Sequence, residues 1–288
     1  MIDLNKYFSN SQDESKTDFF PLMSNEDEDK IGKESTPNTL AILPLKNTVL
    51  FPGVIIPITI GRDKSIKLIN DSENSNKKIG VLSQKDPHIE VPTINDLNNI
   101  GTVAQILKTL KMPDGNITAI IQGRKRFKVE NIVKEEPYLV ASVQEINDKK
   151  YQKNKTSDAL ISSVRDLALK IIEESPNIPS EANIALKNIK SSSFLVNFVS
   201  SNMNIDLEIK QSLLEETDFE KRANSVLKYL TKELQILEMK NKIQSKVKID
   251  LDKQQKEYLL NQQLKAIKEE LGESGSIKEI EELSRLAL

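Results

Sequence analysis

The spacing of apolar residues changes along this chain and divides it into three kinds of sequence. Between residues 39 and 148, short apolar runs alternate with turn-forming residues, a pattern typical of β-strands. From residue 149 onward, apolar positions recur about every 3.6 residues, as they do on one face of a helix. Residues 1–38 are polar and charged and show neither period, so they are predicted to be a disordered tail.

The β-rich segment contains a strong hairpin signal at Pro113 and Gly115. Proline presets φ at the first corner of a turn and glycine accepts a positive φ, so these residues are predicted to join two strands. A helix is expected at 62–72, where Ile66 and Ile69 form one apolar face. Many short strands with one covering helix predict a compact, mostly antiparallel barrel or sandwich, an α+β fold once the later helices are added. The predicted strands span 40–45, 54–60, 78–85, 101–111, 116–123, 124–133 and 138–146.

Residues 149–217 are predicted to form a small helical bundle. The first helix begins with Thr156 or Ser157 as a plausible cap and ends before Pro176. Three shorter helices are expected to follow it, at 180–190, 192–202 and 206–216.

Residues 218–272 are predicted to form one long helix, because no proline or glycine occurs between Asp218 and Leu271. A helix of roughly 54 residues would be about 80 Å long, so part of it must project or pack on another element. Residues 273–288 are expected to begin a further helix that the end of the chain cuts short. Apolar residues at the 4-3-4-3 spacing of a coiled-coil seam are Ala223, Leu227, Leu230, Leu234 and Leu237.

Composition excludes several classes of protein. The formal net charge of -2 favours neither a nucleic-acid protein nor a membrane-surface protein as a whole. The chain has no cysteine, which excludes disulfides, a thiol nucleophile and a cysteine-ligated zinc site. No apolar run reaches the roughly 18 residues of a membrane span, and the N-terminus lacks the features of a signal peptide. The expected location is the cytoplasm, without membrane contact.

The motifs of common catalytic sites are also missing. The nine glycines include neither a P-loop nor a G-x-G pair, so no nucleotide site is predicted. His88 is the one histidine and is expected to be a solvated loop residue. A Ser-Lys dyad is not excluded by counting, but nothing in the sequence marks one. The chain is therefore predicted to hold no catalytic residue, no cofactor-binding residue and no metal ligand.

One basic stripe leaves a nucleic-acid reading open. In the predicted strand at 124–133, Arg124, Arg126 and Lys128 alternate and would share one face. Such a stripe is able to meet phosphate, although it is more often the solvated face of a sheet. The lysines of the long helix are interspersed with acids, which is typical of a solvated coiled-coil surface. DNA remains a weakly supported partner.

Three separated stretches resemble the N-terminal region of the Lon family of ATP-dependent proteases. They are LPLKNTVLFPGVIIPITIGRDKSI (43–66), DLNNIGTVAQILKTLKMPDGNITAIIQGRKRFKV (96–129) and QKEYLLNQQLKAIKEELGE (255–273). The resemblance implies a PUA-like β-rich domain, followed by helices that lead to an AAA+ ATPase and a protease with a Ser-Lys dyad. It also implies a hexameric ring that uses ATP and Mg²⁺ to degrade misfolded and regulatory proteins in the cytoplasm, with this region recognising substrates.

The sequence departs from that family in one respect. It stops 15 residues after ELGE, before any Walker motif or dyad, so no ATP-binding or catalytic residue of the family is carried over. The unfinished helix at 277–288 favours a fragment of a longer protease. The alternatives are a standalone binding or adaptor protein with a Lon-like domain and, less favoured, a nucleic-acid-binding module.

Apolar residues at predicted turns are candidates for contact with unfolded protein, because an apolar turn residue is costly unless it packs or binds. They are Phe51, Pro52, Val54 and Ile55 at one turn and Met112 at the hairpin. The alternative is that these residues close the core of the β-rich domain. Aromatic and apolar residues in the tail are candidates for a short docking motif, although a disordered tail with incidental aromatic residues is favoured: Tyr7, Phe8, Phe19, Phe20, Leu22 and Met23.

The last section of the long helix is a candidate surface for self-association. It carries an apolar stripe that would be exposed on an isolated helix, and it is expected to pack on the bundle or on another subunit. We expect weak, concentration-dependent association of the chain. The residues of this stripe are Tyr258, Leu259, Leu260, Leu264 and Ile267.

Overall fold

The computed structural model describes residues 34–73, 77–113, 115–149, 154–175, 178, 181–270 and 283–286. The chain divides into two compact units, one within Met1–Leu234 and the other within Gln235–Leu288. Most of the predicted tail, including its aromatic residues, lies outside the described residues. So does most of the segment at 273–288.

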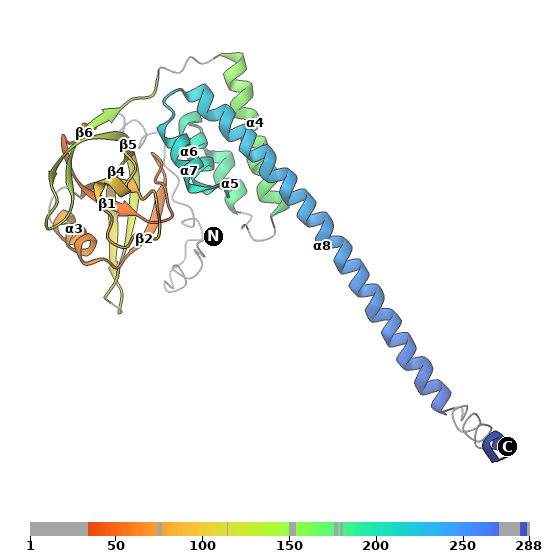
Figure 1. Cartoon of the computed structure of the whole chain (residues 1–288). Coiled ribbons are helices and arrows are strands. Elements are labelled where there is room, and N and C mark those ends of the chain that lie inside the picture. The colour runs from red at the N-terminus through yellow and green to blue at the C-terminus, as the bar shows by residue number, and fades with distance from the viewer. Residues whose placement is uncertain are drawn as a thin grey trace, which may run out of the picture. The chain divides into compact units, whose positions relative to one another are not determined.

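The β-rich part is one mixed sheet that closes on itself (Figure 1). Every ladder between its strands is antiparallel except that between β1 and β3, so the prediction of a mostly antiparallel barrel is confirmed. A helix, α3 (Asp63–Glu73), follows the second strand, and a short 3₁₀ turn, η1 (Ile94–Asp96), precedes the fourth. The strands are β1 (Thr39–Leu45), β2 (Ile55–Ile60), β3 (Lys78–Ser83), β4 (Ile100–Lys111), β5 (Ile117–Lys134) and β6 (Val140–Ile146).

The length of β5 closes the barrel. Its 18 residues pair with β2 and β4 in the first half and with β6 in the second half. The prediction of two strands, at 116–123 and 124–133, is therefore wrong, because no turn-forming residue other than Gly123 interrupts the run and Gly123 continues the strand. The hairpin prediction is confirmed: Met112 N donates to Asn116 O at 2.9 Å, and Gly115 has a φ of 84°.

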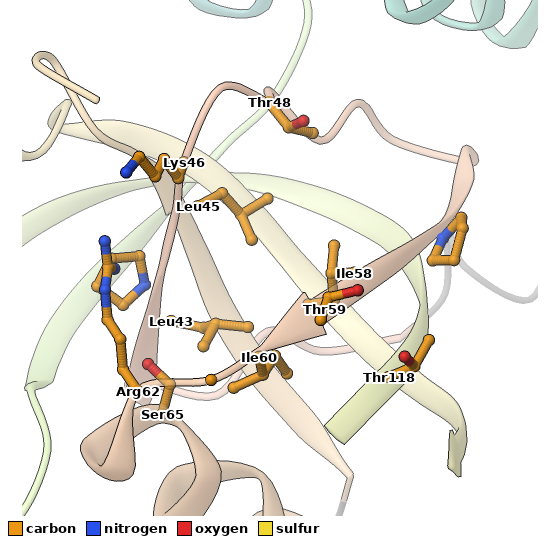
Figure 2. Close-up of a pocket in the computed structure, with 13 residues that line it drawn as sticks. Leu43, Leu45, Lys46, Thr48, Ile58, Thr59, Ile60, Arg62, Ser65 and Thr118 are labelled. Carbon is orange, nitrogen blue, oxygen red and sulfur yellow. The ribbon is translucent and has the colours of Figure 1, made fainter. Parts of the chain in front are cut away.

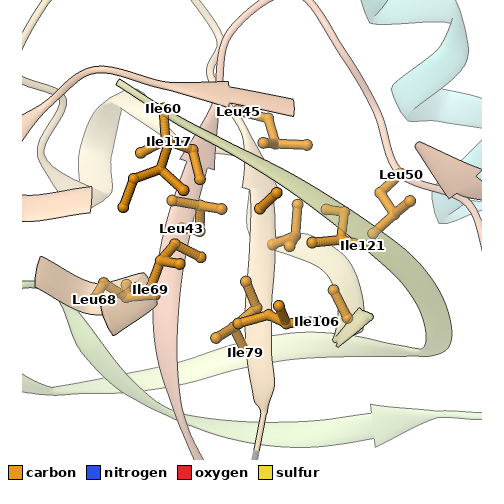
Figure 3. Close-up of a cluster of buried hydrophobic side chains, with 13 residues drawn as sticks. Leu43, Leu45, Leu50, Ile60, Leu68, Ile69, Ile79, Ile106, Ile117 and Ile121 are labelled. Atoms are coloured by element: carbon orange, nitrogen blue, oxygen red, sulfur yellow. The ribbon is translucent and has the colours of Figure 1, made fainter. Parts of the chain in front are cut away.

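Two apolar clusters fill the two faces of this sheet. Leu43 and Leu45 of β1 pack into the first cluster with Ile60, Ile69 and Ile121 (Figure 3). The second cluster contains Leu40 and Ile42 of the same strand, together with Leu82 and Phe127. Side chains of a strand alternate between its faces, so β1 is buried on both of them. This explains its continuous apolar sequence.

The helical part contains α4 (Lys155–Glu174), α5 (Glu181–Asn188), α6 (Ser192–Asn202), α7 (Leu207–Glu215) and α8 (Phe219–Glu270). The cap of α4 is Asn154, not Thr156 or Ser157 as predicted. Asn154 Oδ1 accepts from Ser157 N at 2.8 Å, and Ser157 Oγ accepts from Asn154 N at 3.0 Å. The predicted cap residue Ser157 is thus the third residue of the helix and completes a capping box.

The helix α8 has 52 residues, which confirms the long helix. Its first part, within the unit that ends at Leu234, buries Ala223, Val226, Leu230 and Leu234. In the part from Ile243 to Ile267, the large apolar side chains are more than half exposed. The two parts of the helix therefore differ: the first has a buried face, and the second presents its apolar side chains to solvent.

None of the helices in the described ranges combines the length and the apolar character that crossing a membrane requires.

Candidate functional site

A pocket of about 420 Å³ lies between β1 and β2, next to the start of α3 (Figure 2). Its volume falls in the range of small-ligand sites. Its walls combine six apolar side chains with four hydroxyl groups, and Lys46 and Arg62 supply two cations. None of the described residues that line it is acidic. The lining residues are Leu43, Pro44, Leu45, Lys46, Thr48, Pro57, Ile58, Thr59, Ile60, Gly61, Arg62, Ser65 and Thr118.

The pocket is bordered by strand edges that have no neighbouring strand. β2 pairs with β5 along one edge, and the described ladders give it no partner on the other. β1 pairs with β6 only through Thr39–Ala41, so its continuation at Leu43–Leu45 pairs with β3 alone among the described strands. Both unpaired edges contribute residues to the pocket.

The direction of the backbone groups on these edges follows from the hydrogen bonds of their paired sides. Val54 O accepts from Gly123 N at 2.9 Å, so the antiparallel alternation turns Pro57 and Thr59 toward the unpaired edge of β2. Proline has no N–H group, but at a position that faces the unpaired edge it removes no hydrogen bond between β2 and β5. Where it borders the pocket, the unpaired edge of β2 therefore offers the N–H of Thr59 and the carbonyl groups of Pro57 and Thr59.

The same reasoning applies to β1. Leu45 O accepts from Gln84 N at 2.9 Å on the β3 side, whereas Ile42 N donates to Leu139 O at 2.8 Å on the opposite side. Alternation then places the carbonyl group of Pro44 on the edge opposite β3.

The two cations of the pocket differ in their surroundings. Arg62 Nη2 donates to Gln84 Oε1 at 2.8 Å and to Ile89 O at 3.4 Å, which holds the guanidinium in place. Lys46 is exposed. The first turn of α3 begins beside Arg62, and Asp63 in that turn offsets the positive end of the helix dipole, so the positive potential of the pocket comes from Lys46 and Arg62. This end of the pocket favours a neutral or anionic group over a cation.

The turn at Phe51 is largely buried. Phe51 is 0% exposed and Val54 is 5% exposed, so both side chains are buried, as the alternative of a core role expects, and substrate contact by them stays a prediction. The turn folds back on β5: a Cβ on Gly123 would lie 2.2 Å from Phe51 O. Pro52 and Ile55 are half-buried, and Pro52 O accepts from Asn197 Nδ2 of α6 at 3.2 Å.

Met112 lies apart from the pocket, at the tip of the hairpin between β4 and β5. Its side chain is 39% exposed, and Leu107 and Leu110 on the same hairpin are 44% and 41% exposed. Substrate contact by Met112, Pro52 and Ile55 stays a prediction.

Arg124, Arg126 and Lys128 do not share one exposed face, because Arg124 is half-buried and Arg126 is buried. Arg126 is 4% exposed at the junction of the barrel with the helical part. Its Nη1 donates to Leu214 O at 2.7 Å and to Glu216 O at 2.9 Å, and its Nη2 pairs with Asp148. Burial lowers the pKa of Arg126, while the carboxylate of Asp148 acts in the opposite direction. Arg126 therefore connects the barrel to the helical part. Neither phosphate contact nor a solvated sheet face, the two predicted roles, describes this position.

The residues considered for chemistry occupy ordinary positions. His88 is exposed, and its backbone N donates to Asp86 Oδ1 at 2.8 Å. Across the described part of the chain, no group of three or more histidine or acidic side chains is arranged to hold a metal ion.

The candidate residues for self-association are all on the solvent-exposed part of α8. Tyr258 is 66% exposed, Leu264 52% and Ile267 55%. Leu259 and Leu260 are exposed to 58% and 53%. Their role in association stays a prediction.

Sequence reasoning missed Lys46, Thr59 and Arg62 as candidates, because period and composition do not reveal which strand edges remain unpaired. A signal was nevertheless present. All the lining residues except Thr118 fall within residues 43–66, the stretch that opens the Lon-like similarity.

Comparison with known proteins supports the resemblance to Lon proteases. Residues 39–232 match the model of the ATP-dependent protease La (LON) substrate-binding domain. A Lon protease of Flavobacterium johnsoniae is 53% identical over 275 residues, which is 95% of this chain and 34% of that protein. A Lon protease of Cytophaga hutchinsonii is 44% identical over 96% of this chain and 34% of its own length.

Among solved structures, the N-terminal domain of the Mycobacterium avium complex Lon protease shares the fold. It has a TM-score of 0.56 and 17% identity, covering 67% of this chain and 98% of that domain. The chain thus spans about a third of the length of the curated relatives, at 34% of each. The barrel, the helices after it and the sequence matches lead to one conclusion: this chain belongs to the family of the ATP-dependent protease La (LON) substrate-binding domain.

Proposed function

We propose that this chain is the substrate-recognition and assembly region of an ATP-dependent Lon-type serine protease that degrades misfolded and regulatory proteins in the cytoplasm. The observation that supports this most strongly is the family match over residues 39–232. The relatives named above are Lon proteases in which this chain corresponds to about a third, at 34% of their length.

The division of labour in this proposal follows from the similarity to Lon proteases. ATP and Mg²⁺ binding and the Ser-Lys dyad belong to other parts of the protease, and the present region delivers protein substrates to them. The pocket between β1 and β2 supports this role, because apolar walls beside unpaired strand edges suit an unfolded chain. The exposed apolar side chains of α8 suit assembly into a ring, a hexamer in the proposal.

The experiment that tests the function is degradation of a permanently unfolded protein by the full-length protein from its own cells. We expect proteolysis that requires ATP and Mg²⁺. The size of that protein, detected with an antibody against residues 39–148, separates this proposal from an adaptor. A species more than twice 32.5 kDa supports the protease, and one near 32.5 kDa supports a standalone adaptor.

A nucleic-acid-binding function has less support, since Arg126 is buried in the junction. Measurement of DNA and RNA binding at low salt tests it, because phosphate-driven binding is strongest there. We expect no binding.

A further inference from the structure

We propose that the pocket between β1 and β2 binds an extended segment of a protein substrate as an added strand, and that it selects segments in which apolar residues accompany acidic ones. This inference rests on the proposed function of substrate recognition and specifies the chemistry of the substrate. The occupant is an unfolded stretch of polypeptide, held by its main chain on the unpaired edge of β2.

The main chain of a bound segment would pair with the free edge of β2. An unpaired strand edge binds an extended peptide through alternating N–H and carbonyl groups, and the pairing is independent of side-chain identity. On β2, the alternation described above directs the N–H and carbonyl of Thr59 and the carbonyl of Pro57 to this edge. Thr59 supplies the donor that Pro57 lacks, so it is the central residue for strand addition.

The pocket also offers apolar surface to the side chains of the peptide. Leu43, Leu45 and Ile60 belong to the buried apolar cluster of the barrel and also line the pocket (Figure 2). An apolar side chain of an added strand would therefore meet the core of the barrel, and its burial stabilises binding through the area removed from water.

The charge of the pocket would select among such segments. The lining contains Lys46 and Arg62 and no acidic residue among those described. A lysine or arginine in the bound segment would face these cations without a counter-charge, whereas an aspartate, a glutamate or a terminal carboxylate would be attracted to them. Charge complementarity makes the preferred segment neutral or acidic, and discrimination against basic segments follows from repulsion.

The test measures binding to the 288-residue chain by fluorescence anisotropy. The probes are two fluorescein-labelled eight-residue peptides, one alternating Val and Glu and the other alternating Val and Lys. We expect the Val/Glu peptide to bind at least fivefold more tightly. Equal affinity, or tighter binding of the Val/Lys peptide, would overturn the proposed selectivity.

Matched variants separate main-chain pairing from charge. Thr59→Pro removes the edge N–H and is expected to weaken binding of the Val/Glu peptide at least fivefold, whereas Thr59→Ala keeps the N–H and should stay within twofold. Lys46→Glu should weaken the same peptide about three- to tenfold, whereas Lys134→Glu, which is exposed outside the pocket, should not. If both pocket variants bind as the wild type does, the peptide is not held at this edge and the inference is wrong.

Two further measurements keep the test decisive. If Thr59→Pro does not fold, as judged by circular dichroism, a Val/Glu peptide N-methylated at alternate residues replaces it, and undiminished binding of that peptide rules out strand addition. Binding of reduced, carboxymethylated α-lactalbumin, an unfolded protein, separates substrate recognition by the chain from the role of the pocket in it. If it binds the wild type and all pocket variants equally, substrate recognition stands and the pocket inference fails. If it does not bind the wild type, both fail.

Discussion

The carboxylate of Asp148, just after the last barrel strand, accepts a hydrogen bond from Arg222 Nη2 of α8 at 3.1 Å. The same carboxylate pairs with Arg126 of β5. Arg222 and Arg126 are nearly fully buried, with side chains 2% and 4% exposed. One carboxylate thus pairs with two buried guanidinium groups and connects the barrel to the start of the long helix.

Removal of that carboxylate should destabilise the first unit. Asp148→Asn removes the one carboxylate that forms an ion pair with both buried arginines, and breaking a buried ion pair is strongly unfavourable. Because Asp148 is 35% exposed, we expect a loss at the low end, about 2–3 kcal/mol of the free energy of unfolding in urea. Asp250→Asn, at an exposed position of α8, is the control and should change stability little. An unchanged urea midpoint for Asp148→Asn would show that the junction contributes no net stability.

The burial of Phe51 leads to a prediction about the turn before β2. Phe51→Ala should lower the free energy of unfolding by about 3–5 kcal/mol, because it leaves a cavity in a packed core. Met112→Ala, at the exposed hairpin tip, should stay within about 0.5 kcal/mol. Comparable stabilities of the two variants in a thermal or urea melt would contradict the core role of Phe51.

Close approach of the backbone gives Gly123 a specific requirement. A Cβ there would lie 2.2 Å from the carbonyl oxygen of Phe51, and backbone does not yield readily. Gly123→Ala should therefore cost about 1–3 kcal/mol, measured by urea unfolding. At Gly61 the added Cβ would meet Asn116 Oδ1, the end of a flexible side chain, at 2.6 Å. Gly61→Ala is the control and should cost less than about 1 kcal/mol.

The exposed end of α8 should mediate weak self-association. We expect the apparent mass from light scattering to rise with concentration, because packing of this stripe on a second copy removes apolar surface from water. The double variant Leu264→Glu/Ile267→Glu should abolish the rise. Gln254→Glu/Gln255→Glu adds the same charge without removing apolar side chains and serves as the control. A wild type that remains monomeric at high concentration would refute the prediction.

Stability should fall in acid partly through Glu145. Burial alone would raise the pKa of Glu145, but hydrogen bonds from Thr36, at 2.6 Å, and Lys125, at 3.0 Å, outweigh it and lower the pKa below its ordinary value of 4.5. The folded state therefore binds the proton less readily than the unfolded state. The lowered pKa of Glu145 therefore stabilises the folded state above pH 4.5, and this stabilisation is lost as the pH falls through the pKa of the folded state.

The variant Glu145→Gln isolates that contribution. Thermal melts from pH 7 to pH 3 should show a smaller fall in unfolding temperature for Glu145→Gln than for the wild type. Between pH 7 and pH 3, the two proteins should differ by at most about 1 kcal/mol in the unfolding free energy that they lose, because the pair of Glu145 and Lys125 is partly exposed. Parallel pH curves for the two proteins would mean that Glu145 does not titrate differently in the folded state.

Local patterns were sufficient to predict much of the fold. The hairpin at Pro113 and Gly115, the helix after β2 and the 52-residue α8 were all expected from sequence. Each depends on interactions between residues near in sequence, such as turn chemistry and helical period. The prediction was wrong at β5, where a strand was expected to end at Gly123 but continues through it. The glycine instead allows Phe51 to approach, a contact that connects residues distant in sequence.

In the candidate site, too, features set by neighbouring residues were predictable and contacts between distant residues were not. The sequence by itself determined the family, the β-to-helix order and the presence of an apolar, proline-rich stretch at residues 43–66. Only the tertiary structure decided that Phe51 and Val54 lie in the core, that Arg126 joins the barrel to the helices, and that the edges of β1 and β2 stay unpaired beside Lys46 and Arg62. The physical reason is that burial and strand pairing depend on which distant segments meet, and that is settled by closure of the whole sheet.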